Sequence, residues 1–202
     1  MEKQKFKTNV IVEIAIFAAI ALALDFLQGG LWRGFFVNGG SIGLAMIPVL
    51  IMGYRRGFIA GLVTGLIVSL LQMMGGIYVI SNSWYNALLQ ISLDYLLTYP
   101  VIALCAIFRK PFMNAENTKQ KLLYLSLGTL IGGLGKFLMH FLAGILFWKN
   151  FDFKGGYVLY SLVYNGGYML PNIIIAIIIM IVLYLKAPKI IVLESEANDE
   201  KE

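Results

Sequence analysis

The sequence predicts an all-α membrane protein, a bundle of six transmembrane helices with both termini in the cytoplasm. Of its 202 residues, 59% are hydrophobic and only 13% are charged, and the mean hydropathy is +0.80. One soluble core cannot hide this much apolar surface. Several apolar runs approach the roughly 20 residues that cross a bilayer core about 30 Å thick. Short polar connections separate these runs.

The first apolar segment, residues 10–27, follows Lys3, Lys5 and Lys7. A signal peptide also begins with basic residues ahead of an apolar run. Here more membrane sequence follows instead of an exported domain, so we expect a retained first span.

The second segment, residues 42–54, is too short to cross a bilayer unaided at ~1.5 Å per residue. We expect it to borrow residues from the turn at 39–41 or to bend at Pro48. Five spans plus a re-entrant piece is therefore an alternative to six.

The remaining segments cover residues 57–74, 86–108, 122–147 and 160–185, and the last contains Pro171. We treat residues 1–188 as one transmembrane substrate-binding domain. Residues 189–202 form an acidic tail that we expect to be disordered.

Basic residues support this topology, because Lys and Arg accumulate in cytoplasmic loops. With the N-terminus inside, only Arg33, Lys149 and Lys154 fall in outer loops, and Lys136 falls within the fifth span. The other basic residues are cytoplasmic: Lys3, Lys5, Lys7, Arg55, Arg56, Arg109, Lys110, Lys119, Lys121, Lys186, Lys189 and Lys201.

Ionisable residues inside spans are costly and are candidates for functional sites. The candidates are Asp25, Asp94, Lys136 and His140, with Glu13 near the inner end of the first span. By their distance from the outer helix ends, Asp94, His140 and Asn165 share one outer layer, although they come from three different helices.

Lys136, His140, Gly144 and Trp148 recur every four residues, which places them on one face of the fifth helix. Gly144 would leave a notch for a flat ring between an imidazole and an indole, while Asp94 would meet a cationic ring. Lys136 could instead pair with Asp94, and His140 could serve as a hydrogen-bond partner between helices.

All three tryptophans, Trp32, Trp84 and Trp148, fall on the outer side. They indicate either an interfacial belt or the wall of a pocket. On the first span, Ala15, Ala19 and Ala23 repeat every four residues, a spacing that allows close helix approach. This stripe would pack inside the bundle or dock a separate membrane subunit.

The sequence also excludes several functions. It has no phosphate-binding glycine loop followed by Lys and Ser or Thr, so we expect no ATP hydrolysis by this chain. One histidine and one cysteine, Cys105, give no metal site. No basic patch with interleaved aromatics points to nucleic acid. No Ser–His–Asp order stands out, and we expect no cofactor.

The chain resembles the thiamine-specific substrate-binding component (S-component) of an energy-coupling factor (ECF) transporter. The resemblance runs from Glu13 to Pro171. It rests on the order and spacing of short pieces: Glu13 to Ala19, Gly39 to Ile42, Met46 to Pro48, Tyr54 to Gly57, Leu93 to Tyr95, Lys136 to His140 with Gly144, and Tyr160 to Gly166.

This resemblance implies a six-helix bundle in the cell membrane with an outward-facing, high-affinity thiamine pocket. Ala15 and Ala19 would dock on a transmembrane coupling subunit, which two cytoplasmic ATPases drive. The ligand contacts that the resemblance implies are Asp94 facing the thiazolium charge, Tyr95, Lys136, His140, Gly144, Trp148, Tyr160 and Asn165, with Trp84 and Trp32 as further candidates.

Three alternatives remain open at this point. One is an S-component for another vitamin, such as riboflavin or a hydroxymethylpyrimidine. Another is a small membrane enzyme that uses His140 and Asp94 as an acid–base pair. The third is a solitary proton-coupled carrier.

Overall fold

The computed structural model describes residues 8–32, 35–36, 39–80 and 83–193, and within these ranges it contains helices and no β-strand. Lys3, Lys5, Lys7, Arg33 and the chain from Glu194 onward lie outside them. Helical structure occurs in each of the six predicted segments. In chain order, the elements are α1 (Thr8–Leu31), α2 (Ile47–Arg56), α3 (Phe58–Met74), α4 (Trp84–Ile91), the π-helical turn η1 (Ser92–Leu96), the 3-10 helix η2 (Pro100–Phe108), α5 (Arg109–Asn114), α6 (Thr118–Leu146), α7 (Gly156–Lys186) and the 3-10 turn η3 (Pro188–Ile190).

Three of these helices, α1, α6 and α7, are long and apolar enough to cross a membrane. A fourth span results if Trp84–Leu96 and Pro100–Asn114, which meet at a 50° bend, cross as one broken span. The apolar α3 is shorter, at 17 residues, and α2 has 10. The all-helical membrane class is therefore confirmed, whereas the number six stays a prediction.

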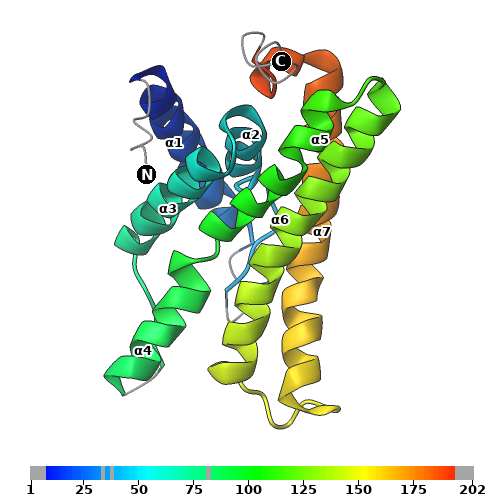
Figure 1. Cartoon of the computed structure of the whole chain (residues 1–202). Helices are drawn as coiled ribbons and strands as arrows, with labels where there is room; N and C mark the ends of the chain where they lie inside the picture. The colour runs from blue at the N-terminus through cyan, green and yellow to red at the C-terminus, as the bar shows by residue number, and fades with distance from the viewer. Residues whose placement is uncertain (1–7, 33–34, 37–38, 81–82, 194–202) are drawn as a thin grey trace.

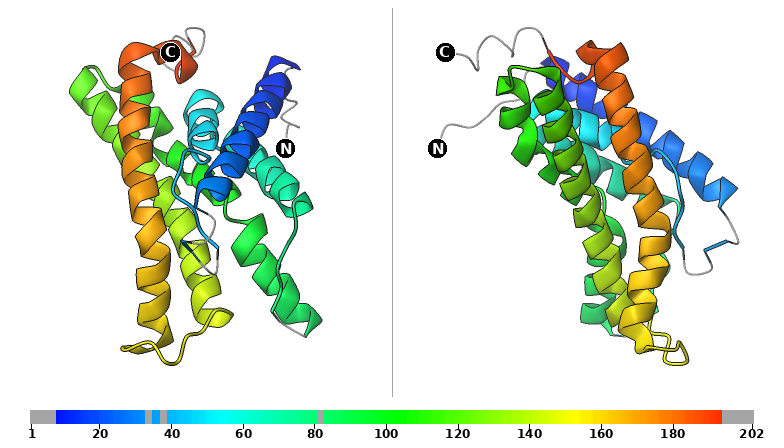
Figure 2. Two further views of the ribbon diagram at one scale, coloured as in Figure 1. Left: turned by 180° about the vertical axis from the view of Figure 1, so that it is seen from behind. Right: turned by 90° about the vertical axis from the view of Figure 1, so that its right-hand side faces the viewer.

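The two longest helices, α6 and α7, lie side by side along the length of the molecule (Figures 1 and 2). The side chain of Asn117 caps α6 by accepting a hydrogen bond of 2.9 Å from the backbone N–H of Gln120. On another face of α6, Gly132 would place a Cβ 2.6 Å from the carbonyl oxygen of Ile102. Its missing side chain lets η2 pack directly on α6.

The second segment differs from our expectation. Helix α2 begins at Ile47, so Pro48 sits in its first turn, where a missing N–H costs no hydrogen bond. Residues 39–46 are not helical. The helix therefore neither incorporates the turn at 39–41 nor contains a mid-helix bend at Pro48, and both expectations were wrong.

The predicted segment 86–108 is helical, but it is not one regular α-helix. The chain changes from α4 to a π turn at Ser92, where the N–H of Leu97 reaches the carbonyl of Ser92 at 2.9 Å. It then continues as a 3-10 helix from Pro100, which has no N–H to extend the preceding helix. Such π turns are frequent at functional sites, and this one carries Asp94 and Tyr95.

The start of α1 and the end of α7 lie at the same end of the molecule (Figures 1 and 2). There Arg55 binds both the carboxylate of Glu13 and the carbonyl of Lys189, the latter at 2.6 Å. Ile191 is fully buried in the core next to this contact. Residues 189–193, which we expected to begin the disordered tail, thus pack on the bundle.

Candidate ligand-binding site

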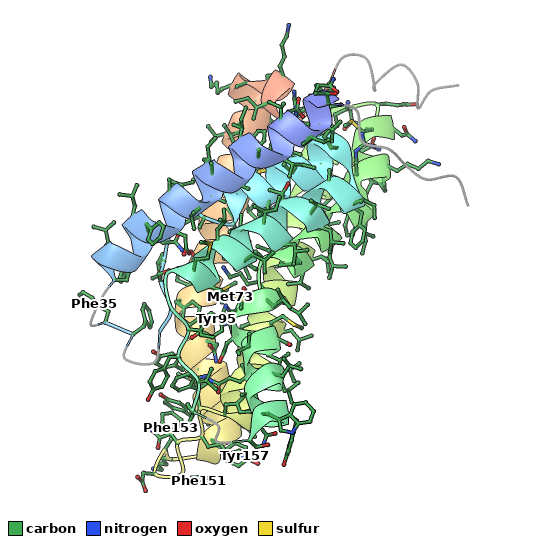
Figure 3. The ribbon with its side chains drawn as sticks, turned by 90° about the vertical axis from the view of Figure 1, so that its left-hand side faces the viewer. Phe35, Met73, Tyr95, Phe151, Phe153 and Tyr157 are labelled. Atoms are coloured by element: carbon green, nitrogen blue, oxygen red, sulfur yellow. The ribbon has the colours of Figure 1, made fainter. Side chains whose placement is uncertain are left out.

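A cavity of about 240 Å³ lies between η1, α6 and α7. Its lining residues come from the second half of α6 and the first half of α7, so it lies toward the connection between these two helices and away from Glu13 and Arg55. Gln72 of α3 and the glycines 39–40 complete its wall. Figure 3 places Tyr95 at mid-height, well above the aromatic residues of the α6–α7 connection. Eight of the ten predicted ligand contacts line the cavity: Asp94, Tyr95, Lys136, His140, Gly144, Trp148, Tyr160 and Asn165.

Neutral donors hold the carboxylate of Asp94. The indole N–H of Trp148 donates to its Oδ2 at 2.8 Å, and the side chain of Gln90 forms another hydrogen bond. The Nδ1 of His140 lies 4.0 Å from Oδ1. The π turn and the faces of α6 thus present one oriented anion to the cavity, with an imidazole beside it.

One of our expectations was that Lys136 pairs with Asp94, and the structure does not show this pair. In the described part of the chain, no ion pair links Lys136 to Asp94. Its ammonium lies instead over the ring of Tyr99, 3.8 Å from the centroid, in a cation–π arrangement. The hydroxyl of Tyr99 donates to the carboxylate of Asp25 at 2.6 Å.

The expected notch at Gly144 is not open. A Cβ at this position would overlap the hydroxyl oxygen of Ser161 and would lie 3.0 Å from Nδ2 of Asn165. The Ser161 hydroxyl in turn donates to the carbonyl of Phe141 at 2.9 Å. Gly144 therefore allows α7 to approach α6 closely at the cavity wall, and the ring-sized notch was a wrong interpretation.

Helix α7 contributes a row of tyrosines, Tyr160, Tyr164 and Tyr168, one turn apart. The ring of Tyr168 packs edge-on against His140, with centroids 5.9 Å apart. Its hydroxyl donates to Oδ1 of Asn165 at 2.7 Å, which fixes the Asn165 amide. We predicted Tyr160 and Asn165 as contacts but not Tyr164 and Tyr168, although the spacing of four residues carried the signal.

The glycine segment closes the cavity on the side of α7. Tyr164 donates its hydroxyl to the carbonyl of Gly39 at 2.9 Å. Gly40 has a φ of +114°, and a Cβ there would lie 2.7 Å from the ring of Tyr168. A residue without a side chain is therefore required where this backbone passes over the tyrosine.

Gln90 is a further residue that sequence reasoning missed. It is fully buried, accepts from the N–H of Ile80 at 3.0 Å and donates to the carbonyl of Tyr78 at 3.2 Å. Tyr78 stacks on Trp148 with centroids 5.8 Å apart. Gln90 thus ties the α3–α4 connection to the Asp94 carboxylate. Its only sequence signal is an amide one helical turn before Asp94.

Two predicted contacts lie elsewhere. Trp84 begins α4 and is 79% exposed, and Trp32 packs against Phe35 and Phe36 at centroid distances of 5.4 and 6.0 Å. Neither is among the described residues that line the cavity. A ligand contact of either tryptophan stays a prediction.

The small residues of α1 divide between its two faces. Ala18 and Ala21 are buried in the core, at 1% and 0% exposure. Ala15, Ala19 and Ala23 are exposed on the opposite face. The stripe therefore does not pack inside this bundle, which was one of our two alternatives.

Comparison with known proteins agrees with this geometry. Residues 11–192 match the family described as thiamine transporter protein (Thia_YuaJ). The thiamine transporter ThiT of Bacillus subtilis is 34% identical over 185 residues, covering 90% of this chain and 93% of that protein. The ThiT of Lacticaseibacillus paracasei is 31% identical over 191 residues, covering 91% and 90%.

A solved structure of ThiT from Listeria monocytogenes superimposes with a TM-score of 0.75. It is 31% identical in sequence, and the match covers 91% of this chain and 97% of that one. The enzyme alternative is therefore wrong. The chain belongs to the thiamine transporter protein family and is a multi-pass membrane protein of thiamine transport.

Proposed function

We propose that this protein is the high-affinity thiamine-binding subunit of an ECF-type transporter in the cell membrane. It captures thiamine in the cavity around Asp94 from outside the cell. A transmembrane coupling subunit and two cytoplasmic ATPases then drive import. The observation that carries the proposal is the carboxylate of Asp94, held by Trp148 and Gln90 in a cavity lined with aromatic rings.

The chemistry of thiamine suits this cavity. Its thiazolium ring is a cation, and a carboxylate held by neutral donors keeps a net charge to offer it. Its aminopyrimidine is a flat ring with donors and acceptors. Trp148, Tyr168 and His140 offer aromatic surfaces, and the fixed amide of Asn165 offers a hydrogen-bonding group.

The sibling alternatives fit less well. Riboflavin has no cationic ring, so its binding would desolvate Asp94 without offsetting the charge. A solitary proton-coupled carrier would not need the outward stripe of Ala15 and Ala19. That stripe supports docking on a partner helix, because small side chains allow close approach.

The positions of the basic residues indicate how the protein is oriented in the membrane. Arg55, Arg56 and Lys189 gather near Glu13 at one end of the bundle. By the positive-inside rule this end faces the cytoplasm. The cavity lies toward the other end and therefore opens to the outside.

Titration of the purified protein tests the ligand. We expect one thiamine per chain by calorimetry and a fall in tryptophan fluorescence. Since Trp148 lines the cavity, Trp148→Phe should remove most of the fluorescence change, whereas Trp84→Phe should keep it. Heat with riboflavin and none with thiamine would contradict the assignment.

Reconstitution tests the coupling to ATP. The chain should co-purify with the coupling subunit and the ATPases. Vesicles that carry the whole complex with the ATPases facing the lumen should accumulate thiamine when the lumen contains ATP. Disabling the phosphate-binding lysine of both ATPases should stop uptake. Equal uptake by the chain alone would favour the solitary carrier.

A further inference from the structure

Asp25 is an acidic residue of α1 that is not among the proposed ligand contacts. Three side chains donate to its carboxylate: Tyr99 at 2.6 Å, Gln72 at 2.9 Å and Gln28 at 3.3 Å. These donors come from the approach to η2, from α3 and from α1 itself. These three donors fix the position and orientation of the carboxylate.

Two of these donors connect Asp25 to the cavity. Tyr99 and Gln72 both line it, whereas Asp25 does not. Asp25 therefore sits one side chain behind the wall, on the helix that carries the stripe of Ala15 and Ala19. Gln28 also binds Ser41 at 2.9 Å, so the same cluster reaches the glycine segment.

Asp25 is also linked to Lys136, through Tyr99. The ammonium lies over the ring of Tyr99, and the hydroxyl of Tyr99 donates to the carboxylate of Asp25. An unbalanced ammonium inside a bilayer is costly. In the described chain no ion pair joins Lys136 to Asp94 or to Asp25, and Tyr99 is the residue that links the ammonium to a carboxylate, that of Asp25.

The partner of Lys136 determines the net charge that a ligand meets in the cavity. Of the described residues that line the cavity, Asp94 is the carboxylate and Lys136 the ammonium. If these two charges balanced each other, the cavity would be neutral. If Asp25 instead balances Lys136, one negative charge remains on Asp94 for the ligand.

We propose that Asp25 is a specificity-determining residue, which neutralises Lys136 from behind the wall and so makes the cavity select a monocation over an uncharged ligand of the same shape. The inference rests on the proposed function, because thiamine supplies the monocation. It adds a residue, Asp25, that acts without touching the ligand.

The test compares thiamine with an uncharged analogue in which carbon replaces the thiazolium nitrogen. The measured quantity is the ratio of the two Kd values, by calorimetry on the purified full chain. Asp25→Asn keeps the shape and removes the charge, so the preference for thiamine should fall roughly tenfold or more. Lys136→Met in the wild-type background should shift the ratio the other way.

Two further variants separate charge from shape. Adding Lys136→Met to Asp25→Asn should return the ratio toward the wild-type value, even if both ligands bind more weakly. Tyr99→Phe removes one hydrogen bond but keeps both charges and the ring under Lys136. It should change the ratio by less than about threefold, the effect of one neutral hydrogen bond.

The outcomes are distinct. A wild-type protein that does not bind thiamine would overturn the proposed function. If the wild type binds thiamine and Asp25→Asn weakens both ligands equally, or changes neither, the inference on Asp25 fails alone. Should Asp25→Asn not fold, Lys136→Met decides, and an unchanged or reduced cation preference in that variant overturns the inference.

Discussion

The two ends of this bundle each hold a carboxylate, one with cationic and the other with neutral hydrogen-bond donors. At the end that we propose to be cytoplasmic, here called the inner end, Glu13 accepts four hydrogen bonds, from Arg55 at 3.0 and 2.9 Å and from Arg56 at 2.8 and 3.1 Å. At the outer end, Asp94 accepts from the neutral side chains of Trp148 and Gln90 and faces a cavity.

This difference shows how to separate structural from functional charges in a membrane bundle. Two cations of the same chain neutralise Glu13, so its carboxylate is not available to bind a ligand. Its contacts join α1 to α2. Neutral dipoles orient Asp94 without neutralising it. A charge that the protein orients but does not neutralise is the better candidate for binding.

The sharpest way to break the comparison is Asp94→Asn. Removal of one member of a partly buried charge pair costs about 2–5 kcal/mol, so we expect thiamine affinity to fall by roughly 30-fold to several thousandfold. The uncharged analogue should lose far less. Calorimetry with both ligands measures this, and an equal loss would mean that Asp94 supports the fold rather than the cation.

Gly144→Ala should have the next largest effect on binding. The added Cβ overlaps the hydroxyl of Ser161, and overpacking of this kind costs about 1–3 kcal/mol. We expect a lower unfolding temperature in detergent and weaker thiamine binding. Leucine at this position should be worse.

A matched double variant tests the mechanism of that loss. Ser161→Gly clears the space that the new methyl group needs, so the pair Gly144→Ala and Ser161→Gly should recover part of the lost affinity. If Gly144→Ala alone binds and unfolds as the wild type does, close packing of α6 on α7 is not what the glycine provides.

At the inner end, Glu13→Gln should change stability but not affinity. It leaves Arg55 and Arg56 adjacent without their shared carboxylate, and a lost hydrogen bond to a charged group costs about 1.5–3 kcal/mol. The side chains retain 12–20% exposure, which favours the lower end of that range. Thermal unfolding should show the loss, while a thiamine Kd changed more than about threefold would link the two ends.

Helix periodicity explains which parts of the site could be predicted from the sequence. Lys136, His140, Gly144 and Trp148 share one wall because four-residue spacing fixes a face of α6 whatever surrounds it. Depth counted from the outer helix ends brought Asp94 and Asn165 to the same cavity. Both arguments depend on one helix at a time.

The features that the sequence did not predict depend on contacts between elements. The break at Pro100 and the π turn before it decide where Asp94 points, and neither alters the apolar pattern of the segment. Lys136 is linked to Asp25 through Tyr99, which requires α1, α6 and the start of η2 in their packed positions. Trp84 could not be placed, since the start of α4 was unknown.

The last variant is expected to leave the outer end untouched. Ala15 and Ala19 lie on the exposed face of α1, away from the buried Ala18. Replacing both with leucine should leave the thiamine Kd and the unfolding temperature unchanged, because no side chain of the bundle has to move. It should block close approach of a partner helix.

Co-purification with the coupling subunit and vitamin uptake in cells are therefore the readouts that should be lost in this double variant. Ala18→Leu is the matched control, because the same added volume at 1% exposure must disturb the core and lower the unfolding temperature. Loss of thiamine binding in the Ala15 and Ala19 variant would mean that this face communicates with the cavity, through Asp25 on the same helix. Unchanged uptake would remove the docking role, since a helix that tolerates two leucines at its closest contact is not packed there.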